Sequence, residues 1–63
     1  MYTSEFTKRW DPKNGFTQQE AVVKKQKVDE AHGVGTPKSK WNPATIVLDP
    51  NKESGFKVVI TSK

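Results

Sequence analysis

The sequence predicts a small α+β domain of order β-α-β-β, in which one helix packs on a small antiparallel sheet that ends in a C-terminal β-hairpin. Three observations predict this class. A helix-capping motif stands at residues 17–20, two β-branched runs lie near the C-terminus, and aromatic residues alternate with polar ones at the N-terminus. The 63 residues suffice for a single domain, 1–63.

Residues 1–10 alternate in character. Tyr2, Phe6 and Trp10 fall on one side of an extended chain, with threonines on the other. Aromatic residues and threonine favour a strand, whereas chain ends often fray. We therefore expect a strand or a frayed terminus over residues 1–10.

Residues 18–32 are predicted to form the helix. Thr17 and Glu20 have the spacing of a capping box, in which each side chain accepts a hydrogen bond from the other residue's backbone N–H. Gly33 provides a left-handed stop after His32. Because the segment contains no leucine, we expect the helix to depend on packing against the sheet.

Residues 44–61 favour a β-hairpin, which follows a flexible basic connector at residues 33–40. A segment dense in turn-forming residues separates the two apolar runs. In the register that pairs Leu48 with Phe56, alternate residues of both strands face the helix. These residues are Ile46, Leu48, Phe56, Val58 and Ile60.

One three-residue motif occurs three times: an apolar residue, then Asp or Asn, then Pro. Asp or Asn before Pro is typical of turns, because the ring fixes the backbone and the short polar side chain bonds the backbone ahead. Two copies run on into Gly-Phe, at Gly15-Phe16 and Gly55-Phe56. The copies are Trp10-Asp11-Pro12, Trp41-Asn42-Pro43 and Leu48-Asp49-Pro50.

The apolar residues for a core are few. A chain of this length buries only about 60% of its unfolded surface, and without cysteine it has no disulfide or thiolate metal site to strengthen it. The strengthening partner could be another protein chain, a nucleic acid or a second copy. The plainer alternative is a modestly stable monomer, because many domains of this length fold unaided. The expected core residues are Tyr2, Phe6, Trp10, Phe16, Val22, Val23, Val28, Ile46, Val47, Leu48, Phe56, Val58, Val59 and Ile60.

The charge balance is basic. Eleven Lys and Arg against seven Asp and Glu give a net charge of +4 and a pI near 9.6. Such a balance is typical of proteins that bind nucleic acid, although it also keeps small proteins soluble. Because ten of the eleven cations are lysines, we expect contacts to phosphate more than to bases.

Basic residues stand next to both tryptophans, a combination that binds single strands through phosphate contacts and base stacking. The plainer alternatives are that the tryptophans belong to the core and that the helix lysines form a solvated face. The candidate nucleic-acid-binding residues are Lys8, Arg9, Trp10, Lys24, Lys27, Lys38, Lys40 and Trp41.

The sequence predicts no enzyme, cofactor or metal site, because His32 is the sole imidazole and the carboxylates are scattered over caps and turns. We expect a cytoplasmic, non-enzymatic accessory protein that binds nucleic acid. The alternative is a protein-binding inhibitor or modulator of a larger host enzyme, or an accessory subunit of a larger particle. No apolar run is long enough for a membrane span.

Overall fold

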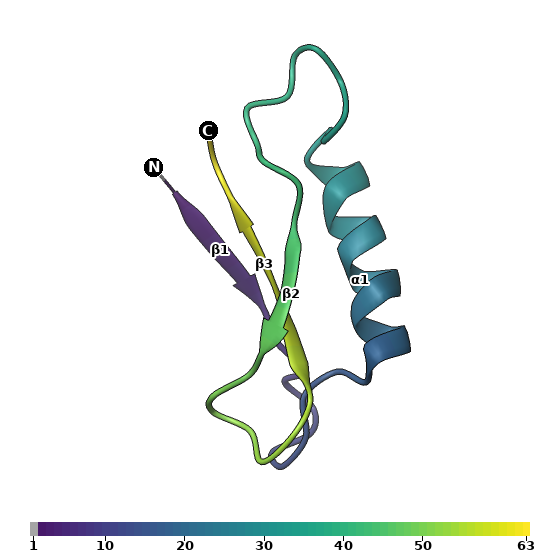
Figure 1. Cartoon of the computed structure of the whole chain (residues 1–63), viewed down its shortest axis with the longest axis vertical. Helices are drawn as coiled ribbons and strands as arrows, with labels where there is room; N and C mark the ends of the chain where they lie inside the picture. Colours follow the sequence, from purple (N-terminus) through teal and green to yellow (C-terminus); the bar gives the residue numbers. More distant parts are fainter. Residues whose placement is uncertain (1) are drawn as a thin grey trace.

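The computed structural model describes residues 2–63, which form one helix and a three-stranded antiparallel sheet. The strands lie in the order β1-β3-β2, so the C-terminal strand is central (Figure 1). This confirms the α+β class and shows a strand near the N-terminus; Met1 lies outside the described residues. The elements are β1 (Thr3–Phe6), α1 (Gln18–Ala31), β2 (Thr45–Leu48) and β3 (Phe56–Thr61).

The hairpin has the predicted register. Leu48 pairs with Phe56, and Ile46 pairs with Val58. On the other edge of β3, Phe6 of β1 also lies opposite Val58. Because β3 has a strand on each side and the helix against one face, Val58 and Ile60 are fully buried.

The helix begins with the predicted capping box. The hydroxyl of Thr17 accepts a hydrogen bond from the N–H of Glu20 at 3.2 Å, and the Glu20 carboxylate accepts one from the N–H of Thr17 at 3.1 Å. The helix ends at Ala31, one residue before the predicted end. Gly33 follows with a φ of +68° and donates to the carbonyl of Glu30 at 3.1 Å, as a left-handed stop should.

Removing the cap should lower stability measurably. Thr17→Ala leaves the N–H of Glu20 without its partner, and we expect a loss of about 0.5–2 kcal/mol. Thr17→Ser keeps the hydroxyl and is the matched control, with an expected loss close to zero. Thermal unfolding of the two variants measures the difference, and equal midpoints would show that the cap contributes nothing.

The core is smaller than the sequence suggests. Its central cluster consists of Val28, Ala44, Val58 and Ile60, with Phe6, Val34, Trp41 and Ile46 packed against it. Two alanines are buried that were not expected there, Ala21 and Ala44. Small residues let the helix and the start of β2 lie close to the central strand.

The prediction of a buried position was wrong for several residues, which are exposed. Val22 and Val23 are exposed on α1, and Val47 points to the open face of the sheet. Leu48 lies on the predicted face but is 71% exposed, because it ends an edge strand that has no neighbour on its outer side. The residues expected in the core but exposed are Tyr2, Trp10, Val22, Val23, Val47 and Leu48.

The helix lies over β3 and β2, away from β1. Asp29 fixes this position, because its carboxylate accepts a 2.8 Å hydrogen bond from the N–H of Ala44 just before β2. The other carboxylate oxygen accepts a 2.8 Å hydrogen bond from Lys25. In the described residues, no Cα of α1 comes within 8 Å of a Cα of β1. The ribbons of α1 and β1 therefore stand apart (Figure 1), and the side chain of Lys24 reaches from α1 to the Phe6 ring of β1.

This anchor predicts a loss of stability in acid. Burial raises the pKa of Asp29, but the hydrogen bonds from Lys25 and Ala44 outweigh burial and lower it below the ordinary value of 3.8. A carboxyl with a lowered folded-state pKa stabilises the fold fully above its unfolded pKa, and the contribution is lost as the pH falls through the folded value. We expect the urea concentration at the unfolding midpoint to decrease as the pH is lowered below about 4.

The matched variant is Asp29→Asn, which keeps an oxygen for the Ala44 N–H but removes the charge. Its urea midpoint should lie below that of the unchanged protein at neutral pH and should fall less between pH 5 and pH 3, a range of about two units around the ordinary pKa. An identical fall in both proteins would contradict a stabilising role of the ionised carboxylate.

Two of these motifs, those with Asp-Pro, pack against each other through the Gly-Phe pairs that follow them. The N–H of Phe16 donates to the carbonyl of Phe56 and the N–H of Phe56 to that of Phe16, both at 2.9 Å. In each motif the aspartate, Asp11 or Asp49, accepts a 3.0 Å hydrogen bond from the N–H two residues later. The two turns thereby place Phe16 under the start of α1, next to Trp10.

Candidate nucleic-acid interface

Trp10 projects from the loop between β1 and α1 and is 72% exposed. The buried Phe16 ring lies beside it, with ring centroids 5.9 Å apart and planes at 69°. This edge-to-face contact holds the indole at one side while most of its surface stays open to solvent. Of the two tryptophans, Trp10 is therefore the one that can stack on a ligand.

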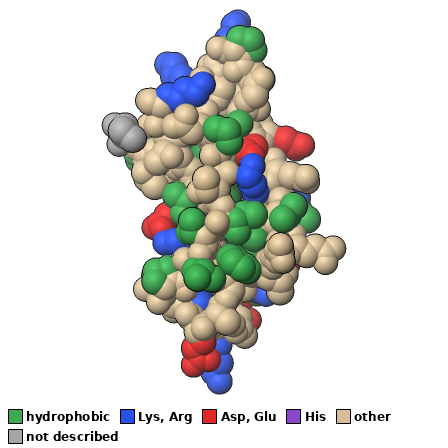
Figure 2. Space-filling model, in the orientation of Figure 1, with side chains coloured by type: hydrophobic (Ala, Val, Ile, Leu, Met, Phe, Trp, Pro, Cys, Tyr) green, Lys and Arg blue, Asp and Glu red, His purple; other side chains and the backbone are tan. Residues whose placement is uncertain are grey.

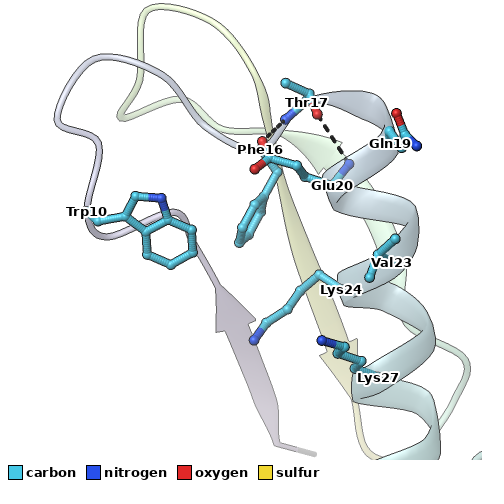
Figure 3. Close-up of a pocket in the computed structure, with 8 residues that line it drawn as sticks. All are labelled: Trp10, Phe16, Thr17, Gln19, Glu20, Val23, Lys24 and Lys27. Carbon is cyan, nitrogen blue, oxygen red and sulfur yellow. Dashed lines mark hydrogen bonds between the residues drawn. The ribbon is translucent and has the colours of Figure 1, made fainter.

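Trp10 borders a hollow of about 420 Å³, within the range of about 300–1,000 Å³ that is usual for ligand sites. Lys24 and Lys27 extend from α1 on the opposite side of this hollow (Figure 3). The Trp10 hollow is lined by Trp10, Phe16, Thr17, Gln19, Glu20, Val23, Lys24 and Lys27.

A second, smaller hollow of about 230 Å³ shares Lys24 and Lys27 with the first. It follows the gap between α1 and β1 toward the end of the helix, past Phe6 to His32. The ammonium of Lys24 lies 5.3 Å from the centroid of the Phe6 ring, close enough for a cation–π contact. We call the two hollows together the α1–β1 groove; it exists because the helix does not cover β1.

Glu20 is the carboxylate that lines the Trp10 hollow. It accepts hydrogen bonds from the N–H of Thr17 and from Lys8, the latter at 3.0 Å, and these two contacts lower its pKa below the ordinary value. Glu20 is thus committed to the helix cap and to Lys8. The pairing of Glu20 with Lys24 that an (i, i+4) spacing favours is replaced by the contact with Lys8.

Lys24 and Lys27, like the lysines of the connector, are outside the ion pairs of the described residues. In the described part of the chain, Lys8, Lys25 and Lys57 are in ion pairs, with Glu20, Asp29 and Glu5. Lys24 and Lys27 are in none of these pairs. Arg9 is exposed next to Trp10 but does not line the hollow.

The second basic-aromatic cluster lies at the other end of the helix. Trp41 is half-buried between His32 and Tyr2, with ring centroids 4.6 Å and 6.0 Å away, and it packs on the core. Lys38 and Lys40 precede it on an exposed connector. The structure therefore separates six of the eight candidate residues into two groups, with Trp10, Lys24 and Lys27 in one and Lys38, Lys40 and Trp41 in the other.

The sequence reasoning missed several groove residues, namely Phe6, Phe16 and Val23 as lining side chains. A signal was present, because Glu20, Val23, Lys24 and Lys27 recur at the three- and four-residue spacing of one helix side. The helix pattern alone could not show that this side lines a groove, because the groove depends on the position of β1.

The surface shows apolar as well as basic areas. Figure 2 shows hydrophobic side chains gathered over the middle of one face, with basic side chains both among them and toward the two ends. Within residues 2–63, no three His, Cys, Asp or Glu side chains are grouped to hold a metal ion. No helix in the same residues has the length and apolar character needed to cross a membrane.

Comparisons with family models, curated proteins and solved structures found no match to this chain.

Proposed function

We propose that this protein binds nucleic acid along the α1–β1 groove, with lysine contacts to phosphate beside the exposed Trp10 ring. The observation that carries the proposal is the exposed Trp10 ring opposite Lys24 and Lys27 across one hollow. Cations that follow the backbone beside an aromatic ring are the usual elements of such sites. We propose an accessory role without catalysis and, for a chain without cysteine, a cytoplasmic location.

The lysines of the groove are available for contacts to phosphate. Lys24 and Lys27 are free of ion pairs among the described residues, so binding a phosphate would not require breaking one. Glu20 lines the same hollow, but Lys8 partly neutralises it. A lysine ammonium is a point charge suited to phosphate from any direction, and the expected binding is therefore independent of sequence.

The test compares two double variants of equal charge. Lys24→Ala with Lys27→Ala removes two positive charges, and so does Lys38→Ala with Lys40→Ala; each takes the net charge from +4 to +2 (4 − 2 = 2). We expect the first pair to weaken binding and to flatten the slope of log K against log salt by about two. The second pair should change the slope by less than one.

Alanine at positions 24 and 27 favours a helix, so the loss would not come from unfolding. Fluorescence anisotropy of a labelled oligonucleotide over a range of salt concentrations measures the slopes. If both double variants lose affinity equally, net charge alone drives binding and the groove has no special part. If the connector variant loses more, the site lies near Trp41.

The second candidate is binding to a protein. What favours it is the outer edge of β2, where Val47 and Leu48 are exposed and residues 45–48 carry no charge. An unprotected edge strand can add a strand from a partner. A complex with a protein that survives high salt and nuclease treatment, together with no binding to oligonucleotides, would favour this candidate.

A further inference from the structure

We infer that the α1–β1 groove takes single-stranded nucleic acid, with an unpaired base stacked on Trp10, and rejects duplex. This inference rests on the proposed function and specifies the ligand of the same site. It follows from the position of Trp10 relative to the lysines, since the cations alone would attract single and double strands alike.

The indole of Trp10 is open to a ligand. Trp10 is 72% exposed, and Phe16 contacts it at an interplanar angle of 69°, so Phe16 does not cover the indole with a parallel ring. A flat aromatic surface is complementary to the face of a nucleobase. In a duplex the base faces are stacked inside and only the base edges reach the grooves, so this contact requires an unpaired base.

The shape of the hollow suits a single strand. The hollow lies between Trp10 on one side and Lys24 and Lys27 on the helix (Figure 3). A single strand can place a base on Trp10 and turn its phosphates toward the helix. A duplex, which is rigid over this length, cannot enter a hollow of about 420 Å³ without opening.

The groove is continuous along the helix. The second hollow continues from the same two lysines along α1 toward His32, past Phe6. A flexible strand can follow this path and keep its backbone near Lys24 and Lys27. Apolar and aromatic side chains line the groove beside the cations, as in sites that tolerate any base.

The test uses a deoxythymidine oligomer of about 12 nucleotides and a duplex of the same length, near the upper end of single-strand site sizes. The Trp41→Phe variant leaves Trp10 as the sole tryptophan. We expect saturable quenching of its emission by the single strand, and an affinity for the duplex at least about 10-fold weaker, within the range that base stacking provides.

The supporting variant is Trp10→Ala in the otherwise unchanged chain, measured by anisotropy. Because Trp10 is largely exposed, the fold should persist. Single-strand affinity should fall roughly 5- to 150-fold with little change in the salt slope, because stacking releases no counterion. Arg9→Ala is the control, since Arg9 is exposed next to Trp10 but lies outside the hollow; its loss should appear in the slope.

The outcomes separate the two proposals. Equal affinity for single strand and duplex, with both reduced by the Lys24/Lys27 variant, would overturn the inference while the proposed function stands. Unquenched Trp10 emission despite single-strand binding, or full affinity in Trp10→Ala, would also overturn it. No binding to either oligonucleotide at low salt would overturn both.

Discussion

Gly55→Ala should unfold the domain or reduce its stability more than any other single alanine substitution. A Cβ at this position would lie 2.6 Å from backbone atoms of Gly15, where neither backbone segment can move without breaking the paired turns. The φ of Gly55 is also +103°, which a residue with a side chain rarely adopts. Overpacking and backbone strain each cost about 1–3 kcal/mol, against a net stability of about 3–5 kcal/mol for a chain this small.

Two other glycines separate these contributions. Gly35 has a φ of +91° but no atom within 4 Å of a new Cβ, so Gly35→Ala adds strain alone. Gly15 is not among the glycines of positive φ, yet a new Cβ would lie 2.7 Å from the carbonyl oxygen of Phe56, so Gly15→Ala adds mainly the clash. Urea unfolding should rank the losses with Gly55 first. A Gly55→Ala protein as stable as Gly35→Ala would contradict the close approach of the two turns.

Ile60→Ala should have the second-largest effect. Ile60 is fully buried on the central strand and belongs to the cluster with Val28, Ala44 and Val58. Truncating a buried isoleucine costs about 2–5 kcal/mol, partly through the cavity that remains. In a domain of this size such a loss leaves little or no folded protein at ambient temperature.

The control for this prediction is Leu48→Ala, which removes the same number of carbon atoms from the end of β2. Leu48 is 71% exposed, so its truncation should cost less than about 0.5 kcal/mol. Circular dichroism with urea titration measures both variants. Comparable losses would mean that Leu48 is buried in solution, for example by a second copy or another chain on the β2 edge.

Local features of the fold could be predicted from the sequence. The Thr17–Glu20 cap follows from an interaction between residues close together in the sequence. The pairing of Leu48 with Phe56 follows from the strict alternation of apolar residues in the two strands. Such signals do not depend on the rest of the chain. The helix boundary at Gly33 is of the same kind, because only the backbone freedom of glycine is needed there.

The extent of burial could not be predicted in the same way. Alternation assigns Leu48 to the helix face, but the exposure of that side chain depends on what covers the end of an edge strand. Trp10 and Trp41 have similar sequence surroundings, yet Trp10 is exposed while Trp41 packs between His32 and Tyr2. These differences arise from contacts between residues distant in the sequence.

The candidate site shows the same division. The sequence named Trp10, Lys24 and Lys27 as candidates, Trp10 from a basic-aromatic cluster and the two lysines from the helix, without connecting them. It gave equal weight to Lys38, Lys40 and Trp41, which lie elsewhere. What brings the first three together is the placement of α1 over β2 and β3, which the Asp29 contact with Ala44 helps to fix. Such a tertiary hydrogen bond has no sequence signature.

The central claim is that the α1–β1 groove binds nucleic acid, and amide chemical-shift mapping tests it most directly. The isotope-labelled protein is titrated with a short deoxythymidine oligomer at low salt. The account predicts the largest changes at the Trp10 amide and indole N–H, at Phe16, and at Val23, Lys24 and Lys27 of α1. Changes confined to residues 33–41, or to Val47 and Leu48, would contradict it. The absence of any change among the described residues would contradict it as well.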